Sequence, residues 1–402
     1  SDFVHITGNM AFSQSSGMDV TLVGGGTKTV NVLTLGASNL NVFVGSGPYF
    51  IDSNNDGTID ENDTRSADAV GLALDNVSFA VAIYTPDDQS DKSRYHAVSV
   101  SANSIGLVGI GSGASDVFTL TAASYRVELN GGKDGSDTAA KPAIDFSALP
   151  GGMHSVDIGG GQTIDFDYNA RLLRVSVVDA LLKISDFIYV SGSFSFTKSE
   201  GSEVTLDDGS TRQVKINAFG GNDVDVFVGS GPYFVDSNSD GVIDRSDDRD
   251  EDAVGLVMEN IDFGLILMTA TNGDKAKFKS LKINADLVSF VGLDVFEFAA
   301  RDITVDYNAG SKSGATNYQR VVDFSAFAGG SYLLDTGSGE IAFDASSKIL
   351  KATVASARLS IGDNVFFDGA FVFTKQDGLS VTLTSGAQKS VNALLIGAEN
   401  VS

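Results

Sequence analysis

The chain has 402 residues, of which 52 are Asp or Glu and 27 are Lys or Arg, so its formal net charge is −25. This charge argues against binding to nucleic acid, because the phosphates would be repelled by the protein surface. A hydrophobic content of 42% argues against disorder, and the absence of cysteine excludes disulfides and thiolate metal sites. No apolar run approaches the ~18 residues of a membrane span, so we expect no membrane insertion.

Alternating apolar residues predict half-buried β-strands along the whole chain. In 33–42 the alternation is interrupted by a small-residue corner, Gly36-Ala37-Ser38-Asn39, and then resumes. The segments 72–79, 98–107, 118–127 and 175–184 have the same form. We see no amphipathic helix of useful length, and we predict an all-β fold.

Self-comparison reveals an internal repeat. The segment 42–50 (Val-Phe-Val-Gly-Ser-Gly-Pro-Tyr-Phe) recurs at 226–234 with an offset of 184, and 145–148 recurs at 323–326 with an offset of 178. The segment 381–383 matches both 20–22 and 204–206. We therefore predict repeats of about 180 residues, with the end of one repeat at 1–18, complete repeats at 19–202 and 203–379, and the start of another at 380–402. Because the chain begins and ends inside repeats, we expect it to be an excerpt of a longer protein.

Two architectures fit this pattern. In a β-solenoid, each strand–corner–strand segment forms part of one coil and stacks on the next. In the alternative, tandem β-sandwich domains, each repeat forms its own pair of sheets. Recurrence of the corner motif inside the repeat, without Pro-rich linkers between repeats, favours the solenoid.

Each complete repeat contains one acidic, glycine-containing segment of twelve residues, at 52–63 and at 236–247. In both segments Asp, Asn and Asp stand at positions 1, 3 and 5, glycine at position 6, isoleucine at position 8 and Asp at position 12. Both resemble the calcium loop of EF-hands and dockerin modules, in which a tightly wound backbone supplies most of the six to eight oxygens that Ca²⁺ prefers. Asp/Asn/Gly clusters are usually solvated turns, but two ordered matches at equivalent places indicate calcium binding.

The predicted ligands are side-chain oxygens at positions 1, 3, 5, 9 and 12 and the backbone carbonyl at position 7. They are Asp52, Asn54, Asp56, Thr58, Asp60 and Asp63 in the first loop, and Asp236, Asn238, Asp240, Val242, Asp244 and Asp247 in the second. The flanking residues are strand-like, so we expect calcium to act as a clamp and not as a switch. We predict no catalytic residues, and the histidines at 5, 96 and 154 show no ligand or base spacing.

The repeats are similar to those of giant repetitive bacterial surface or secreted proteins, the class of calcium-dependent adhesins and matrix fibres. The similarity covers essentially the whole chain through the Gly-Pro-Tyr-Phe block, the calcium loops and the strand–corner pattern. It implies an extracellular or bacterial cell-surface location. The nonapeptide repeats of RTX proteins are absent.

The function that we expect is a calcium-stabilised structural segment of an extracellular fibre, stalk or matrix protein, with self-association along or between repeats. The first alternative is an adhesive module that binds a glycan or a cell-surface partner through exposed aromatics such as Tyr49 and Tyr233. The second is a β-helical polysaccharide-degrading enzyme, which duplication of the acidic cluster disfavours. We therefore predict that the protein is not an enzyme.

Overall fold

The computed structural model describes residues 4–57, 59, 62–66, 68–108, 118–134, 142–185, 187–239, 247–271, 273–293, 295–315, 318–362 and 365–402. Within these ranges the regular structure is β, and the helical segments are short 3₁₀ turns, η1 (Phe146–Ala148), η2 (Phe324–Ala326) and η3 (Ala328–Gly330). The prediction of an all-β fold is confirmed. No helix in this part of the chain is both long and apolar enough to cross a membrane.

The chain divides into two compact units. Unit 1 comprises Ser1–Asp179 and Phe196–Ser202, and unit 2 comprises Ala180–Ser195 and Glu203–Ser402. Strands β13 (Arg171–Ile184) and β14 (Ile188–Thr205) carry residues of both units. The repeat boundaries predicted above rest on sequence similarity and stay predictions.

Unit 1 is built on a sheet of antiparallel strands. Along this sheet β1 pairs with β2, β2 with β5, β5 with β6 and β7, β7 with β8, β6 with β9, and β9 with β13. Its strands are β1 (Val4–Leu22), β2 (Thr27–Ser46), β5 (Val70–Pro86), β6 (Ser93–Ala102), β7 (Ser104–Val108), β8 (Phe118–Ala122), β9 (Ser124–Asp134) and the short β10 (Ile144–Asp145), which pairs with β1. Two small ladders complete the unit, β3 (Phe50–Ile51) with β4 (Thr64–Arg65) and β11 (His154–Gly159) with β12 (Gln162–Phe166).

Unit 2 repeats this order. Its antiparallel sheet runs β15 (Thr211–Ser230), β18 (Val254–Ala270), β19 (Ala276–Val291), β20 (Phe296–Lys312), β23 (Ile349–Ile361), β24 (Val365–Thr382) and β25 (Gln388–Glu399). The small ladders are β16 (Phe234–Val235) with β17 (Asp248–Arg249) and β21 (Tyr332–Asp335) with β22 (Glu340–Phe343). Both bounds of β15 lie 184 residues after those of β2, which is the offset read from the sequence.

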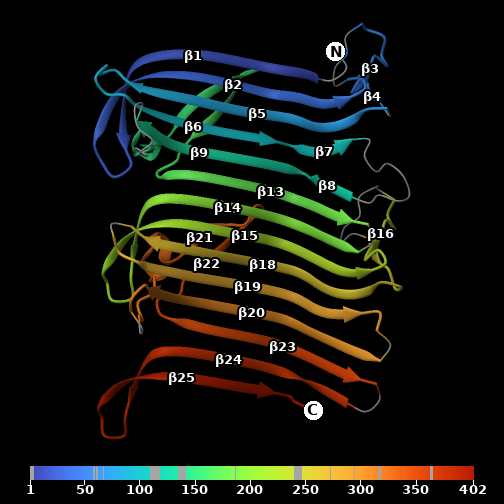
Figure 1. The fold of residues 1–402 in the computed structure, drawn as a ribbon, viewed down its shortest axis with the longest axis vertical. Helices are drawn as coiled ribbons and strands as arrows, with labels where there is room; N and C mark the ends of the chain where they lie inside the picture. Colours follow the sequence, from blue (N-terminus) through green and yellow to red (C-terminus); the bar gives the residue numbers. More distant parts are fainter. Residues whose placement is uncertain are drawn as a thin grey trace. The chain divides into compact units, whose positions relative to one another are not determined.

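The β-solenoid is not confirmed, and the β-sandwich alternative fits better. Every described ladder is antiparallel, and the long strands pair mostly with strands that are close in sequence, whereas the coils of a parallel β-helix place equivalent strands side by side in parallel. In each unit a hairpin forms a second layer on the sheet. In unit 1, β11 packs on β1, β2 and β5, and in unit 2, β21 and β22 pack on β15 and β18 (Figure 1).

The predicted corners are bulges inside continuous strands. Asn39 of β2 and Asn76 of β5 have φ angles of 53° and 52°, in the left-handed region that Asn tolerates better than most residues. The β2–β5 register shifts between Ala37 and Leu40. In unit 2, Asp223 of β15 and Asn260 of β18 repeat this conformation.

These bulges keep one face of a long sheet covered. An extra residue moves every following side chain to the opposite face. In β2 the buried positions are therefore even before the bulge, at Val30 and Val32, and odd after it, at Phe43. A strand of 20 residues, against an ordinary ~5–6, can thus contribute to two separate cores.

Each unit has two cores, one at each end of its long strands. In unit 1 the larger core lies under β11–β12 and includes Val30, Tyr84 and Phe166, and the smaller lies under β3–β4 and includes Phe43, Tyr49 and Phe50. Figure 1 shows β3 and β4 beside the ends of β2 and β5, away from the β11–β12 end. Unit 2 has the same pair of cores under β21–β22 and β16–β17.

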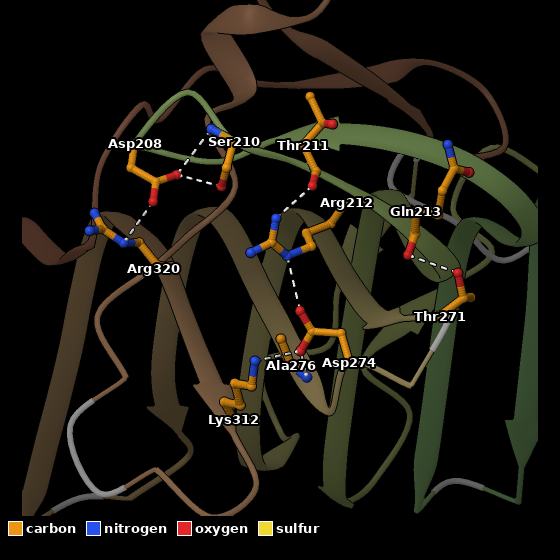
Figure 2. A network of polar contacts seen from close by, with 10 residues as sticks. All are labelled: Asp208, Ser210, Thr211, Arg212, Gln213, Thr271, Asp274, Ala276, Lys312 and Arg320. Carbon is orange, nitrogen blue, oxygen red and sulfur yellow. Dashed lines mark hydrogen bonds and ion pairs between the residues drawn. The ribbon is translucent and has the colours of Figure 1, made fainter.

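A network of charged residues joins the strand ends of unit 2 near its larger core. Asp274 accepts hydrogen bonds from Arg212 on β15 and is paired with Lys312 on β20, both at 3.0 Å (Figure 2). The hydrogen bond from Lys312 lowers the pKa of Asp274 below its ordinary value. Lys28 and Asp91 form the corresponding pair in unit 1 at 2.8 Å. The carboxylates of these pairs are occupied by cationic side chains, so they are poor candidates for metal ligands.

Candidate calcium-binding loops

Each predicted calcium loop connects the two strands of a small ladder. Ile51 pairs with Thr64 at the base of the first loop, and Val235 pairs with Asp248 at the base of the second. The segments 52–63 and 236–247 are therefore closed at corresponding points. Long strands lie on either side, β2 and β5 in unit 1 and β15 and β18 in unit 2, so the prediction of strand flanks is confirmed.

The last acidic residue of each loop is buried and holds the second residue of the loop. Asp63 is 7% exposed, and its Oδ1 accepts the backbone N–H of Ser53 at 2.9 Å. The hydroxyl of Ser53 in turn accepts the N–H of Thr64 at 2.9 Å. In the second loop Asp247, also 7% exposed, accepts the N–H of Ser237 at 3.0 Å. The two loops thus share one closing arrangement.

The first acidic residue of loop 1 presents an oxygen that has no hydrogen-bond partner among the described residues. Asp52 Oδ2 accepts the N–H of Gly57 at 3.2 Å, which folds the loop back on its start, and Gly57 has a φ of 81°, as position 6 requires. Oδ1 of the same carboxylate is buried, and no described group donates a hydrogen bond to it. A buried carboxylate oxygen without a donor is costly. A bound cation would satisfy it.

The described part of the chain contains only some of the predicted ligands. Asp52, Asn54, Asp56 and Asp63 of loop 1 and Asp236, Asn238 and Asp247 of loop 2 are described, whereas Thr58, Asp60, Asp240, Val242 and Asp244 lie outside the described residues. Asn54 and Asp56 bond to each other, with the N–H of Asp56 donating to Asn54 Oδ1 at 2.9 Å. Among the described residues, no group of three or more acidic or imidazole side chains converges as a metal site.

Sequence reasoning missed a polar cluster directly behind each loop. In unit 1, Asp75 accepts hydrogen bonds from Arg65 at 2.6 Å, Ser104 at 2.9 Å and the hydroxyl of Tyr49 at 3.2 Å. In unit 2, Glu259 takes the place of Asp75 and bonds to Tyr233 and Arg249. The tyrosine, the arginine and the acidic residue of unit 2 each lie 184 residues after their counterparts in unit 1. Aligning the two repeats could therefore have indicated this cluster from the sequence.

Tyr49 and Tyr233 are not exposed, contrary to the prediction behind the adhesive alternative. They are 3% and 5% exposed, because each ring stacks on a phenylalanine of the adjacent long strand, Phe43 or Phe227. Burial, with a contribution from Asp75, raises the pKa of Tyr49 to about 12. Both tyrosines therefore belong to the core that supports the loop and cannot stack on a sugar.

A polar cleft of ≈ 540 Å³ lies beside the second loop. It is lined by Phe234, Asp247, Asp248, Arg249, Glu259, Asn260 and Asp286. Two of its carboxylates have partners within the cleft, since Glu259 bonds to Arg249 at 2.7 Å and Asp286 accepts from Asn260 at 2.7 Å.

The fold and these loops define an all-β protein with an internal structural repeat, in which each copy carries an EF-hand-like acidic loop on a small ladder. No protein-family model matches the chain, and neither a curated protein nor a solved structure is detectably similar to it.

Proposed function

We propose that the chain is a calcium-stabilised structural segment of an extracellular fibre, stalk or matrix protein at a bacterial cell surface. The observation that carries the calcium part is the buried Oδ1 of Asp52, which has no hydrogen-bond partner within the described part of the chain and lies in a loop with EF-hand spacing. The structural role rests on duplication, since both copies present the same closed loop above the same tyrosine-containing core.

In this proposal calcium is a clamp on the smaller core of each unit. The twelve-residue loop is the connection between β3 and β4, and Tyr49 and Phe50 immediately before it cover Phe43 of the sheet. A cation held by the loop would fix both ends of this cover. Ligand binding to the folded state alone stabilises it in proportion to the logarithm of free ligand over its Kd. The extracellular location and the self-association of repeats extend the proposal and rest on the sequence resemblance.

The test is a thermal melt and limited proteolysis in Ca²⁺ and in EDTA. We expect EDTA to lower the melting temperature and to open cleavage between residues 52 and 63. Loss of even an outer-sphere partner costs about 10–100-fold in metal affinity, so Asp52→Ala should weaken calcium binding at loop 1 by at least this factor. Asp165→Ala, which removes an exposed carboxylate on β12, is the matched control. An unchanged melt and cleavage pattern in EDTA would refute the calcium clamp.

A second candidate, an adhesive module for a glycan or a partner protein, is favoured by the polar cleft beside β17. With Tyr49 and Tyr233 buried, the support for this candidate comes from this cleft in the described part of unit 2. A glycan array with Asp248→Thr as the comparison variant tests this candidate. Thr is the residue that stands at the equivalent position, 64, in unit 1. Equal glycan-binding signals from the wild type and Asp248→Thr would exclude the cleft as the glycan-binding site.

A further inference from the structure

A histidine lies where the covering hairpin of unit 1 meets the sheet. His154 is the first residue of β11, and its Nδ1 is 2.5 Å from the hydroxyl of Tyr84 on β5. Tyr84 is fully buried and belongs to the larger core of unit 1. This side-chain hydrogen bond therefore connects the hairpin layer to the sheet layer.

Among the described residues, no charged side chain is bonded to His154, whose polar partner is Tyr84. The buried carboxylate at the edge of this core, Glu128, accepts a hydrogen bond from Tyr168 and is paired with Arg174 at 3.0 Å. On β12, Phe166 pairs with His154, so Asp165 and Asp167 point to the opposite face of the hairpin. Charged groups on neighbouring elements have other partners: Asp19 of β1 bonds to Thr29, Lys28 of β2 to Asp91, and Asp145 of β10 to Ser147.

Protonation of His154 would reverse the direction of the hydrogen bond between His154 and Tyr84. A neutral imidazole can accept the Tyr84 proton at Nδ1, whereas an imidazolium has donors on both nitrogens. The Tyr84 hydroxyl oxygen would then have to accept a hydrogen bond from Nδ1–H of His154. The Tyr84 O–H would lose Nδ1 as its acceptor and would be left without a partner in the core. Burial already lowers the pKa of His154, because the charged form is poorly solvated there.

We propose that the contact between His154 and Tyr84 is an acid-sensitive latch, which holds the hairpin β11–β12 on the sheet of unit 1 at neutral pH and releases it on protonation. The direction follows from linkage. A histidine that is held neutral stabilises the folded state above its ordinary pKa of about 6.5, and this stabilisation is lost as the pH falls below that value. Release would expose the larger core of unit 1.

Unit 2 is a built-in control. The equivalent positions there are Tyr332 for His154 and Met268 for Tyr84, and the histidines of the chain, at 5, 96 and 154, all lie in unit 1. The hairpin β21–β22 covers its core without a group that titrates between pH 5 and 8. The latch is thus specific to one copy of the repeat.

The test is hydrogen exchange with mass spectrometry at pH 7.5 and 5.5, with rates corrected for the intrinsic effect of pH. At pH 5.5, one unit below the ordinary histidine pKa of about 6.5, a single histidine can change the opening equilibrium by at most a factor of about ten, so we expect protection of β11–β12 to fall by up to about tenfold, while β21–β22 is unchanged. His154→Gln should abolish this difference. His96→Gln, on the opposite face of β6, should preserve it.

Two results would overturn the latch. One is an equal loss of protection in both hairpins, and the other is a full acid response in His154→Gln. If His154→Gln folds poorly, Tyr84→Phe keeps the ring and removes the hydroxyl, and it should weaken protection of β11–β12 already at pH 7.5. An NMR titration of the wild-type imidazole that gives His154 an ordinary or raised pKa would also contradict the latch.

Discussion

At the scale of single residues, the acidic residue behind each loop accepts hydrogen bonds from one exposed side chain and one buried side chain. Asp75 bonds both to Arg65, whose side chain is 58% exposed, and to the buried hydroxyl of Tyr49. An exposed ion pair contributes about 0–1 kcal/mol. A buried hydroxyl that loses its acceptor costs about 1–3 kcal/mol. The tyrosine contact is therefore the larger contribution.

This inequality gives the first prediction. Asp75→Ala should lower the free energy of unfolding of unit 1 by about 1–3 kcal/mol, and Arg65→Ala should lower it by no more than about 1 kcal/mol. Urea unfolding followed by tyrosine fluorescence measures both, since the chain has no tryptophan. Glu259→Ala and Arg249→Ala should give the same order in unit 2. An arginine variant as damaging as the aspartate variant would contradict this account.

The sequence could predict the loops as candidate sites because the predicted ligands are neighbours in the chain. The spacing of Asp52, Gly57 and Asp63 is local, and the structure gives Gly57 the positive φ that position 6 needs. Asp75 escaped notice because β5 must first fold back along β2 to bring it beneath Tyr49. The exposure predicted for Tyr49 was wrong because the chain turns back after β2 and stacks the Tyr49 ring on Phe43, a contact that alternation of apolar residues does not reveal.

At the scale of elements, one glycine in each unit lets the hairpin layer approach the sheet. A Cβ on Gly36 of β2 would lie 2.2 Å from the backbone oxygen of Asp157 in β11. A Cβ on Gly220 of β15 would lie 2.3 Å from the backbone oxygen of Asp335 in β21. Backbone atoms cannot move aside as a flexible side chain can. In both units, close packing of the hairpin on the sheet therefore requires glycine at this position.

The second prediction concerns this contact. Gly36→Ala should destabilise the docking of β11–β12 by about 1–3 kcal/mol, the usual cost of overpacking. Gly106→Ala on β7 is the control, because a Cβ there has no neighbour within 4 Å. Hydrogen exchange of the β11–β12 amides measures the effect, which should be confined to unit 1. Full protection in Gly36→Ala would mean that the hairpin does not depend on this close approach.

The elements themselves were partly predictable. Alternation of apolar residues in 33–42 correctly indicated strand, because one face of β2 is buried and the other is open. It could not distinguish a corner between two coils from a bulge within one strand, since both need small or Asn-type residues such as Ser38 and Asn39. The structure shows a bulge, because β2 and β5 stay paired in antiparallel fashion on both sides of these residues. The hairpin β11–β12 was not predicted, because its strands are too short to show a clear alternation of apolar residues.

At the scale of the whole molecule, two loops of equal design are set in a chain with a net charge of −25. Such a charge attracts divalent cations generally, so weak binding at many surface carboxylates is expected alongside any specific site. The carboxylates of the strand-end networks are already paired with Lys or Arg, as Asp274 and Asp91 illustrate. Specific binding should therefore follow the number of loops and not the number of acidic residues.

The last prediction is a stoichiometry of two calcium ions, one for each unit. Native mass spectrometry should show two retained ions in the wild type, one after Asp52→Ala with Asp63→Ala, and none after the further changes Asp236→Ala and Asp247→Ala. Asp165→Ala with Asp344→Ala removes the same number of carboxylates as the first pair, both of them exposed and outside the loops, and should leave both ions in place. If instead ion number fell gradually with net charge in every variant, calcium would be a diffuse counter-ion. The duplicated loops would then be turns whose buried Asp63 and Asp247 serve only to close them.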